Sequence, residues 1–173
     1  MRLARTTAAV FSALLLGGVV QGCQPSAKSD CDIAADMMDY RKKTGSEVDA
    51  VKDNSDNMED PNGFILGKYD SWLAETQKDV DSIKDQNVKR PAQAVVDSDK
   101  EYIGIHRAMI VNPPNFDDLT WRAGFDNNMK AVFDRMDKAT NDLKQVCPNV
   151  KTPAVRRSYH QPSGQIFPRT FPV

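Results

Sequence analysis

The sequence predicts an all-α fold, namely an antiparallel up-down four-helix bundle followed by a disordered basic C-terminal tail. Between residues 30 and 147 the apolar residues recur every three or four positions, the spacing that places side chains on one face of a helix. No alternating apolar-polar run is long enough to predict a strand. Prolines are few in this region and mark three joints, because connections accept proline and helix interiors reject it. These joints lie at Pro61, Pro91 and Pro113–Pro114.

The first helix is expected from Asp30 to about Met58, and the second from Asn62 to Lys84. Within the first, Thr44 to Glu47 leaves two alternatives open. The helix either breaks there or starts a new turn, with Thr44 as the cap and Glu47 closing a capping box. The helical stripes are Ile33, Met37, Tyr40, Val48, Val51 and Met58 in the first helix, and Leu66, Tyr69, Leu73, Thr76, Val80 and Ile83 in the second.

The third helix is expected to hold Pro91 in its first turn, and the fourth to run from Asn115 as its N-cap to Cys147. Short joints between helices of this length force neighbouring helices to be antiparallel. An even number of such helices returns the end of the chain to its beginning. The stripes are Ala92, Val95, Val96, Tyr102, Ile103, Met109 and Ile110 in the third helix, and Trp121, Phe125, Met129, Val132, Met136, Ala139, Leu143 and Val146 in the fourth.

The N-terminal residues have the features of an export signal. Arg2 and Arg5 precede an uncharged run in which Ala8 to Val20 form a largely apolar stretch of 13 residues. A basic start, a short apolar run and a small residue before the cut are typical of a secretory signal peptide. Thirteen helical residues span only about 20 Å, less than the roughly 30 Å of a hydrocarbon core. A permanent transmembrane helix is therefore the weaker alternative.

The end of this run, Val20-Gln21-Gly22-Cys23, resembles the lipobox of bacterial lipoproteins, although Gln21 departs from the usual small or aliphatic residue. The resemblance implies that residues 1–22 are a signal peptide and that Cys23 carries a diacylglycerol, with its palmitate-type acyl chains. Two acyl chains give stable anchoring where one alone binds only marginally. The mature protein would then be held by residues 23–29 at the extracytoplasmic face of a cell membrane. Ordinary secretion, with Cys23 incidental, is the alternative.

With Cys23 assigned to the lipid, two cysteines remain, Cys31 and Cys147. An exported protein meets an oxidising compartment, where such a pair usually forms a disulfide. The four-helix topology brings the start of the first helix beside the end of the fourth, and so independently predicts that these two residues meet. Two unpaired buried thiols are the alternative. The bridged end of the bundle is expected to face the membrane.

Charge is distributed unevenly along the chain. Residues 24–147 hold 17 basic and all 24 acidic side chains, whereas residues 148–173 hold four basic side chains and no acid. The tail also has five of the ten prolines and no apolar periodicity, which predicts disorder. A dispensable extension is the favoured interpretation, and contact of its basic and aromatic residues with anionic lipid or wall polymer is the alternative.

Asp99 and His106 are the candidate ligand-binding residues, because both interrupt the apolar face of the third helix. A buried Asp–His arrangement can titrate near neutral pH or bind a ligand. No other His or Cys lies at ligand spacing, so the sequence predicts no metal site and no cofactor. A structural histidine, partly exposed or hydrogen-bonded, is the favoured interpretation, and ligand binding is the alternative.

The sequence contains no phosphate-binding glycine loop, nucleophile elbow, HExxH or CxxC motif, and no catalytic residue is predicted. We therefore expect a non-enzymatic binding or adaptor module for another protein of the cell envelope. The alternative is a bundle that binds a small ligand or a metal through Asp99 and His106. Nucleic acid is not an expected partner outside the cytoplasm.

Overall fold

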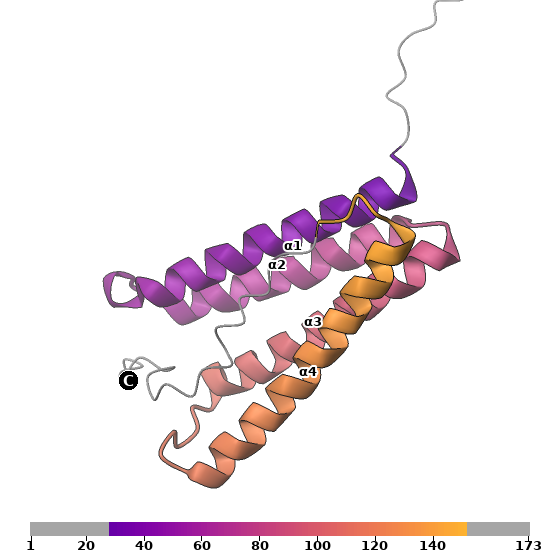
Figure 1. Ribbon diagram of the computed structural model, residues 1–173. Coiled ribbons are helices and arrows are strands. Elements are labelled where there is room, and N and C mark those ends of the chain that lie inside the picture. Colours follow the sequence, from indigo (N-terminus) through magenta and orange to yellow (C-terminus); the bar gives the residue numbers. More distant parts are fainter. Residues whose placement is uncertain (1–27, 152–173) are drawn as a thin grey trace, which may run out of the picture.

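The computed structural model describes residues 28–151, which form four α-helices and the segments that connect them (Figure 1). These residues contain no strand, and the predicted all-α four-helix fold is confirmed. The predicted signal peptide, Cys23 and residues 152–173 lie outside the described residues. The elements are α1 (Asp30–Asp53), a short 3-10 turn η1 (Ser55–Asn57), α2 (Pro61–Ser82), α3 (Gln86–Val111) and α4 (Leu119–Val146).

Polar side chains cap the beginning of every helix. Ser29 and Asp32 form a reciprocal capping box at the start of α1, which satisfies backbone donors that the first turn leaves unpaired. Asp60 caps α2, with Pro61 in the first position, where its missing N–H costs nothing. A carboxylate at these positions also interacts favourably with the helix dipole.

Two predicted helix starts are wrong. α3 begins at Gln86, capped by Asp85, so Pro91 lies inside the helix and not in its first turn. α4 is capped by Asp118 and not by Asn115, whose side chain instead accepts a hydrogen bond from the backbone N–H of Asp117. In both helices the side chain of an aspartate, Asp85 or Asp118, accepts hydrogen bonds from the first-turn backbone and so determines where the helix begins.

α1 continues without a break through Thr44 and Gly45, so the alternative of an interruption is wrong. Thr44 is buried on the inner face of the helix. A Cβ atom at Gly45 would lie 3.6 Å from the Trp72 ring of α2, an ordinary contact distance. Tertiary packing therefore stabilises a segment whose glycine and β-branched residue weaken the helix locally. The helix ends at Asp53, earlier than the predicted Met58.

The helices are arranged as two antiparallel hairpins, α1–α2 and α3–α4, which meet mainly where α2 packs on α3. Figure 1 shows that the hairpins lie together at one end and diverge toward the other. We call the first the closed end; it holds Cys31 and Cys147. The open end holds η1 and the α3–α4 connection. α1 and α4 make few contacts with each other, because the divergence separates them.

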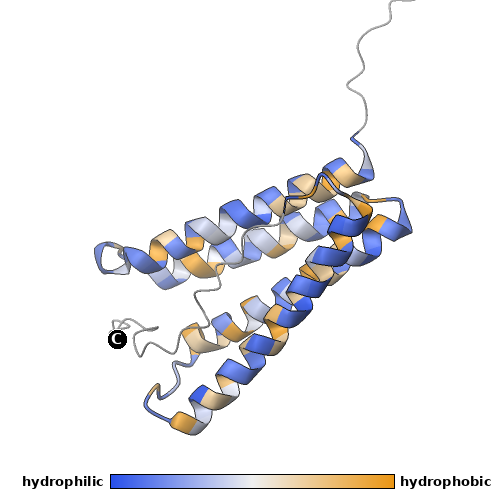
Figure 2. Ribbon diagram, in the orientation of Figure 1, coloured by the Kyte–Doolittle hydropathy of each residue, from blue (hydrophilic) through white to orange (hydrophobic). Residues whose placement is uncertain are grey.

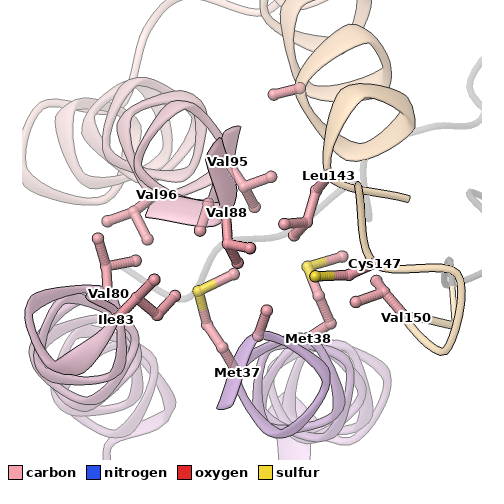
Figure 3. Close-up of a cluster of buried hydrophobic side chains, with 13 residues drawn as sticks. Met37, Met38, Val80, Ile83, Val88, Val95, Val96, Leu143, Cys147 and Val150 are labelled. Atoms are coloured by element: carbon pink, nitrogen blue, oxygen red, sulfur yellow. The ribbon is translucent and has the colours of Figure 1, made fainter. Parts of the chain in front are cut away.

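The main hydrophobic core lies at the closed end and draws on all four helices (Figure 3). Met37 and Met38 of α1 lie between side chains from the other three helices, where the flexible methionine side chain fills irregular gaps. Val150 also belongs to this core and is only 2% exposed. The ordered domain thus extends past Cys147, and the prediction that the disordered tail begins at Pro148 is wrong for residues 148–151.

Cys31 and Cys147 form a disulfide across the closed end, with their Cα atoms 5.3 Å apart. The predicted pairing is confirmed, as is the topology that requires the first and last helix ends to meet. The bridge joins residues 116 positions apart. In the chain-entropy model a bridge across a loop of that length stabilises the folded state by roughly 4–5 kcal/mol, because it restricts the unfolded chain.

A second hydrophobic cluster lies nearer the open end and contains no residue of α4. Its buried members come from α1, α2 and α3: Val48, Val51, Ile65, Tyr69, Trp72 and Ile103. In Figure 2 hydrophobic residues lie where the helices face one another and also at the free beginning of α4. Among the four described helices, α4 packs mainly against α3.

Candidate functional site

A buried ion pair lies at the centre of the bundle, between Arg41 of α1 and Asp99 of α3. The Nε–H of Arg41 donates to both carboxylate oxygens of Asp99, at 2.9 and 2.8 Å. Asp99 is fully buried, and Arg41 is nearly so. Charged groups are rarely found at such positions unless they are paired, because removing an ion from water is costly.

Trp72 of α2 completes the environment of the carboxylate. Its indole Nε1–H donates a hydrogen bond of 3.0 Å to Asp99, and the Arg41 guanidinium lies 5.8 Å from the centre of the Trp72 ring. The guanidinium also contacts the sulfur of Met136 on α4. One polar cluster thereby links all four helices.

The contacts of Asp99 fix its chemical role. Burial raises the pKa of the Asp99 carboxyl, and the opposing effects are the charge of Arg41 and the hydrogen bonds from Arg41 and Trp72. All three hydrogen bonds to the carboxylate come from the protein's own side chains. This arrangement fixes the positions of the helices and holds no acceptor directed at a bound ligand.

His106 lies two turns further along α3, among aromatic rings. The ring centroids of Tyr102 and Tyr69 lie 4.4 and 6.3 Å from its own. Its Nε2 atom is buried and has no hydrogen-bond partner among the described residues. Burial, together with the smaller effect of the nearby charge of Lys52, lowers the pKa of His106 from the ordinary 6.5 to about 3. The imidazole is therefore neutral at neutral pH.

The two predicted ligand residues are thus not brought together. Asp99 binds Arg41 and Trp72, whereas His106 packs against tyrosines. No group of three His, Cys, Asp or Glu side chains in residues 28–151 is arranged to hold a metal ion. Arg41 was not among the predicted site residues, although its spacing of four from Met37 and three from Met38 places it on the inner stripe of α1. Trp72 was not predicted either: it is buried in α2, and its predicted neighbour Leu73 packs partly buried against the second hydrophobic cluster.

Partly exposed aromatic side chains lie in the first half of α4 and just before it. Trp121 and Phe125 continue the stripe that is buried from Met129 onward, but here both side chains are only half-buried. Their rings stack with centroids 5.2 Å apart, and Phe116 packs edge-on against Trp121 at 5.5 Å. We call Phe116, Trp121 and Phe125 the aromatic surface.

The residues around the aromatic surface are apolar and acidic. Val111 and Leu119 are 65% and 75% exposed. Three exposed carboxylates, Asp117, Asp118 and Asp126, form no ion pair with another described residue, and Arg122 is the one basic side chain between residues 112 and 129. A face that is aromatic at its centre and acidic at its rim suits a partner that is apolar and basic.

Compared with models of protein families, with curated proteins and with solved structures, the chain matches none of them. Within residues 28–151, no helix has both the length and the apolar character needed to span a bilayer. Functional inference therefore depends on the residues themselves.

The substitution Asp99→Asn is expected to destabilise the fold by about 3–5 kcal/mol, because it leaves the buried Arg41 charge without its counterion. Asp97→Asn is the matched control: the same change two residues away on α3, at an exposed ion pair with Lys100, costs at most about 1 kcal/mol. Urea unfolding of both variants measures the difference. Equal losses would show that the buried pair has no special role.

Acidification is expected to destabilise the protein through His106. The folded-state pKa of about 3 lies below the ordinary value of 6.5, so the unfolded chain takes up the proton first as the pH falls. Between pH 7 and pH 5 this loss amounts to about 1–2 kcal/mol. His106→Phe is expected to remove it, and urea unfolding at both pH values measures the change. Parallel losses in the variant and the unmodified protein would contradict the assignment.

Proposed function

We propose that this chain is an exported lipoprotein, anchored through Cys23 at the extracytoplasmic face of a membrane, and that its helical bundle is a non-catalytic binding module. The observation that carries the proposal is the disulfide between Cys31 and Cys147. Disulfides of this structural kind belong to oxidising compartments outside the cytosol. Cys23, the last of the residues that resemble a lipobox, precedes the bridged Cys31 by only eight positions.

The fold suits this orientation. Lys28, the first described residue, follows Cys23 by five positions, so at full extension the chain between them spans at most about 18 Å. The closed end is thereby kept close to the lipid. α4 has 28 residues and a length of about 42 Å, which carries the open end away from the bilayer.

The aromatic surface is the proposed contact for a partner protein. Phe116, Trp121 and Phe125 expose apolar area at the open end, and aromatic residues are enriched in the centres of protein interfaces. Binding a ligand or a metal through Asp99 and His106 is the less favoured alternative, since Asp99 is hydrogen-bonded to Arg41 and Trp72.

Replacing Cys23 by alanine is expected to move the protein from the membrane fraction to the soluble fraction, because the acyl chains provide the anchor. The control is the double variant Cys31→Ala/Cys147→Ala, which keeps Cys23 and is expected to stay with the membrane. Intact mass of the unmodified membrane protein is expected to show the lipid and, on reduction, a gain of two hydrogens. A bare mass matching residues 1–173 or 23–173 would contradict anchoring at Cys23.

A photo-crosslinking amino acid at position 121 is expected to give one discrete adduct with an envelope protein in intact cells, because the aromatic surface is the proposed contact. The matched control places the same amino acid at position 64, since Phe64 is also an exposed aromatic residue, 42% exposed, but on α2. Adducts are identified by mass spectrometry. The same adducts from both positions, or none from position 121, would contradict the proposed surface.

A further inference from the structure

The aromatic surface is the part of the inner stripe of α4 that the α1–α2 hairpin leaves uncovered. Trp121 and Phe125 lie on the same helical face as Met129, Val132 and Met136, which are buried. The hairpins diverge here, and among the described residues the buried members of the second hydrophobic cluster come from α1, α2 and α3. From this placement we propose that the C-terminal segment of the same chain, residues 152–173, docks on the aromatic surface.

The segment begins at a place from which it can reach this surface. Val150 is packed in the closed-end core, and Asn149 donates a hydrogen bond to the backbone carbonyl of Cys31, so the chain leaves the domain beside α1. In Figure 1 the last described residues, drawn in yellow, turn back from the end of α4 over the bundle. The described part of the chain thus ends along the bundle, at Lys151, and not beyond its closed end.

The distances agree with this path. Trp121 precedes Val146 by 25 residues of helix, which is about 38 Å. Phe167 follows Lys151 by 16 residues, which extend to about 53 Å, and Phe171 follows it by 20, which extend to about 66 Å. Both phenylalanines therefore reach the aromatic surface without full extension of the chain.

The composition of the segment complements the aromatic surface. Ile166, Phe167 and Phe171 are apolar, and each phenylalanine is followed by a proline, which favours an extended backbone suited to a shallow apolar surface. Residues 152–173 contain three arginines and no acid, whereas residues 28–151 hold 18 basic and 24 acidic side chains. Arg169, between the two phenylalanines, suits the carboxylates of the acidic rim.

The segment of the same chain is favoured over other occupants because it is covalently attached. A tether of this length gives an effective concentration of the order of millimolar, which a second copy or a separate protein rarely reaches. The inference rests on the proposed function in one respect: an envelope partner that uses the aromatic surface must displace the segment. Docking itself requires neither a partner nor a membrane, so the two proposals fail separately.

Trypsin cleavage of the purified mature chain tests the docking. The protein comprises residues 23–173, with Cys23→Ser to keep it free of lipid. The Arg169–Thr170 bond lies between Phe167 and Phe171, so docking is expected to protect it. Phe125→Ala is expected to accelerate its cleavage about two- to tenfold, since aromatic contacts contribute this much to a binding equilibrium. Phe64→Ala, which removes an exposed aromatic side chain from α2, is expected to leave the rate unchanged.

A second variant changes the segment and leaves the bundle intact. Phe167→Ala/Phe171→Ala is expected to accelerate cleavage at Arg169 as Phe125→Ala does, and circular dichroism checks that the helices remain folded. Equal cleavage rates in the unmodified protein and both variants overturn the proposal. Protection that grows with protein concentration assigns the surface to a second copy and also overturns it. Protection that appears only with phosphatidylglycerol vesicles does the same in favour of lipid.

Discussion

The closed end is the constraint on which the rest of the structure depends. The Cys31–Cys147 bridge joins the first and last helices where side chains from all four helices form the main core. Toward the open end the hairpins diverge and the core continues only in α1, α2 and α3. The covalent link therefore lies at the layer to which all four helices contribute. Packing between the hairpins becomes less complete with distance from the bridge, and for this reason the inner face of α4 is buried near the closed end and half-exposed near the open end.

The ion pair of Arg41 and Asp99 lies between these two regions and has a different role. Burying two charges gives back little net stability compared with apolar side chains of the same volume, yet leaving either charge unpaired is expensive. Such a pair therefore penalises alternative helix registers more than it stabilises the native one. With Trp72 and Met136 it fixes the position of every helix at one level of the bundle.

Helix number, topology and the disulfide were predictable because each depends on patterns local to the chain. Apolar spacing defines helices, joints of a few residues define antiparallel neighbours, and the parity of four helices places Cys31 beside Cys147. The environment of Asp99 was not predictable in this way. Its partners lie 58 and 27 positions away on other helices, and only the relative rotation of those helices brings Arg41 and Trp72 to it. The divergence of the hairpins likewise depends on packing between helices.

The two ends of the bundle thus differ in a way that bears on function. Rigidity is concentrated where the chain is bridged, and incompletely covered apolar surface is concentrated where the hairpins separate. A continuous core along α4 would have been more stable, because covering Trp121 and Phe125 would remove apolar area from water. Proteins commonly keep apolar area exposed, at a cost in stability, where that area binds another molecule. The proposed binding therefore depends on the divergence of the hairpins rather than on any residue of the buried polar cluster.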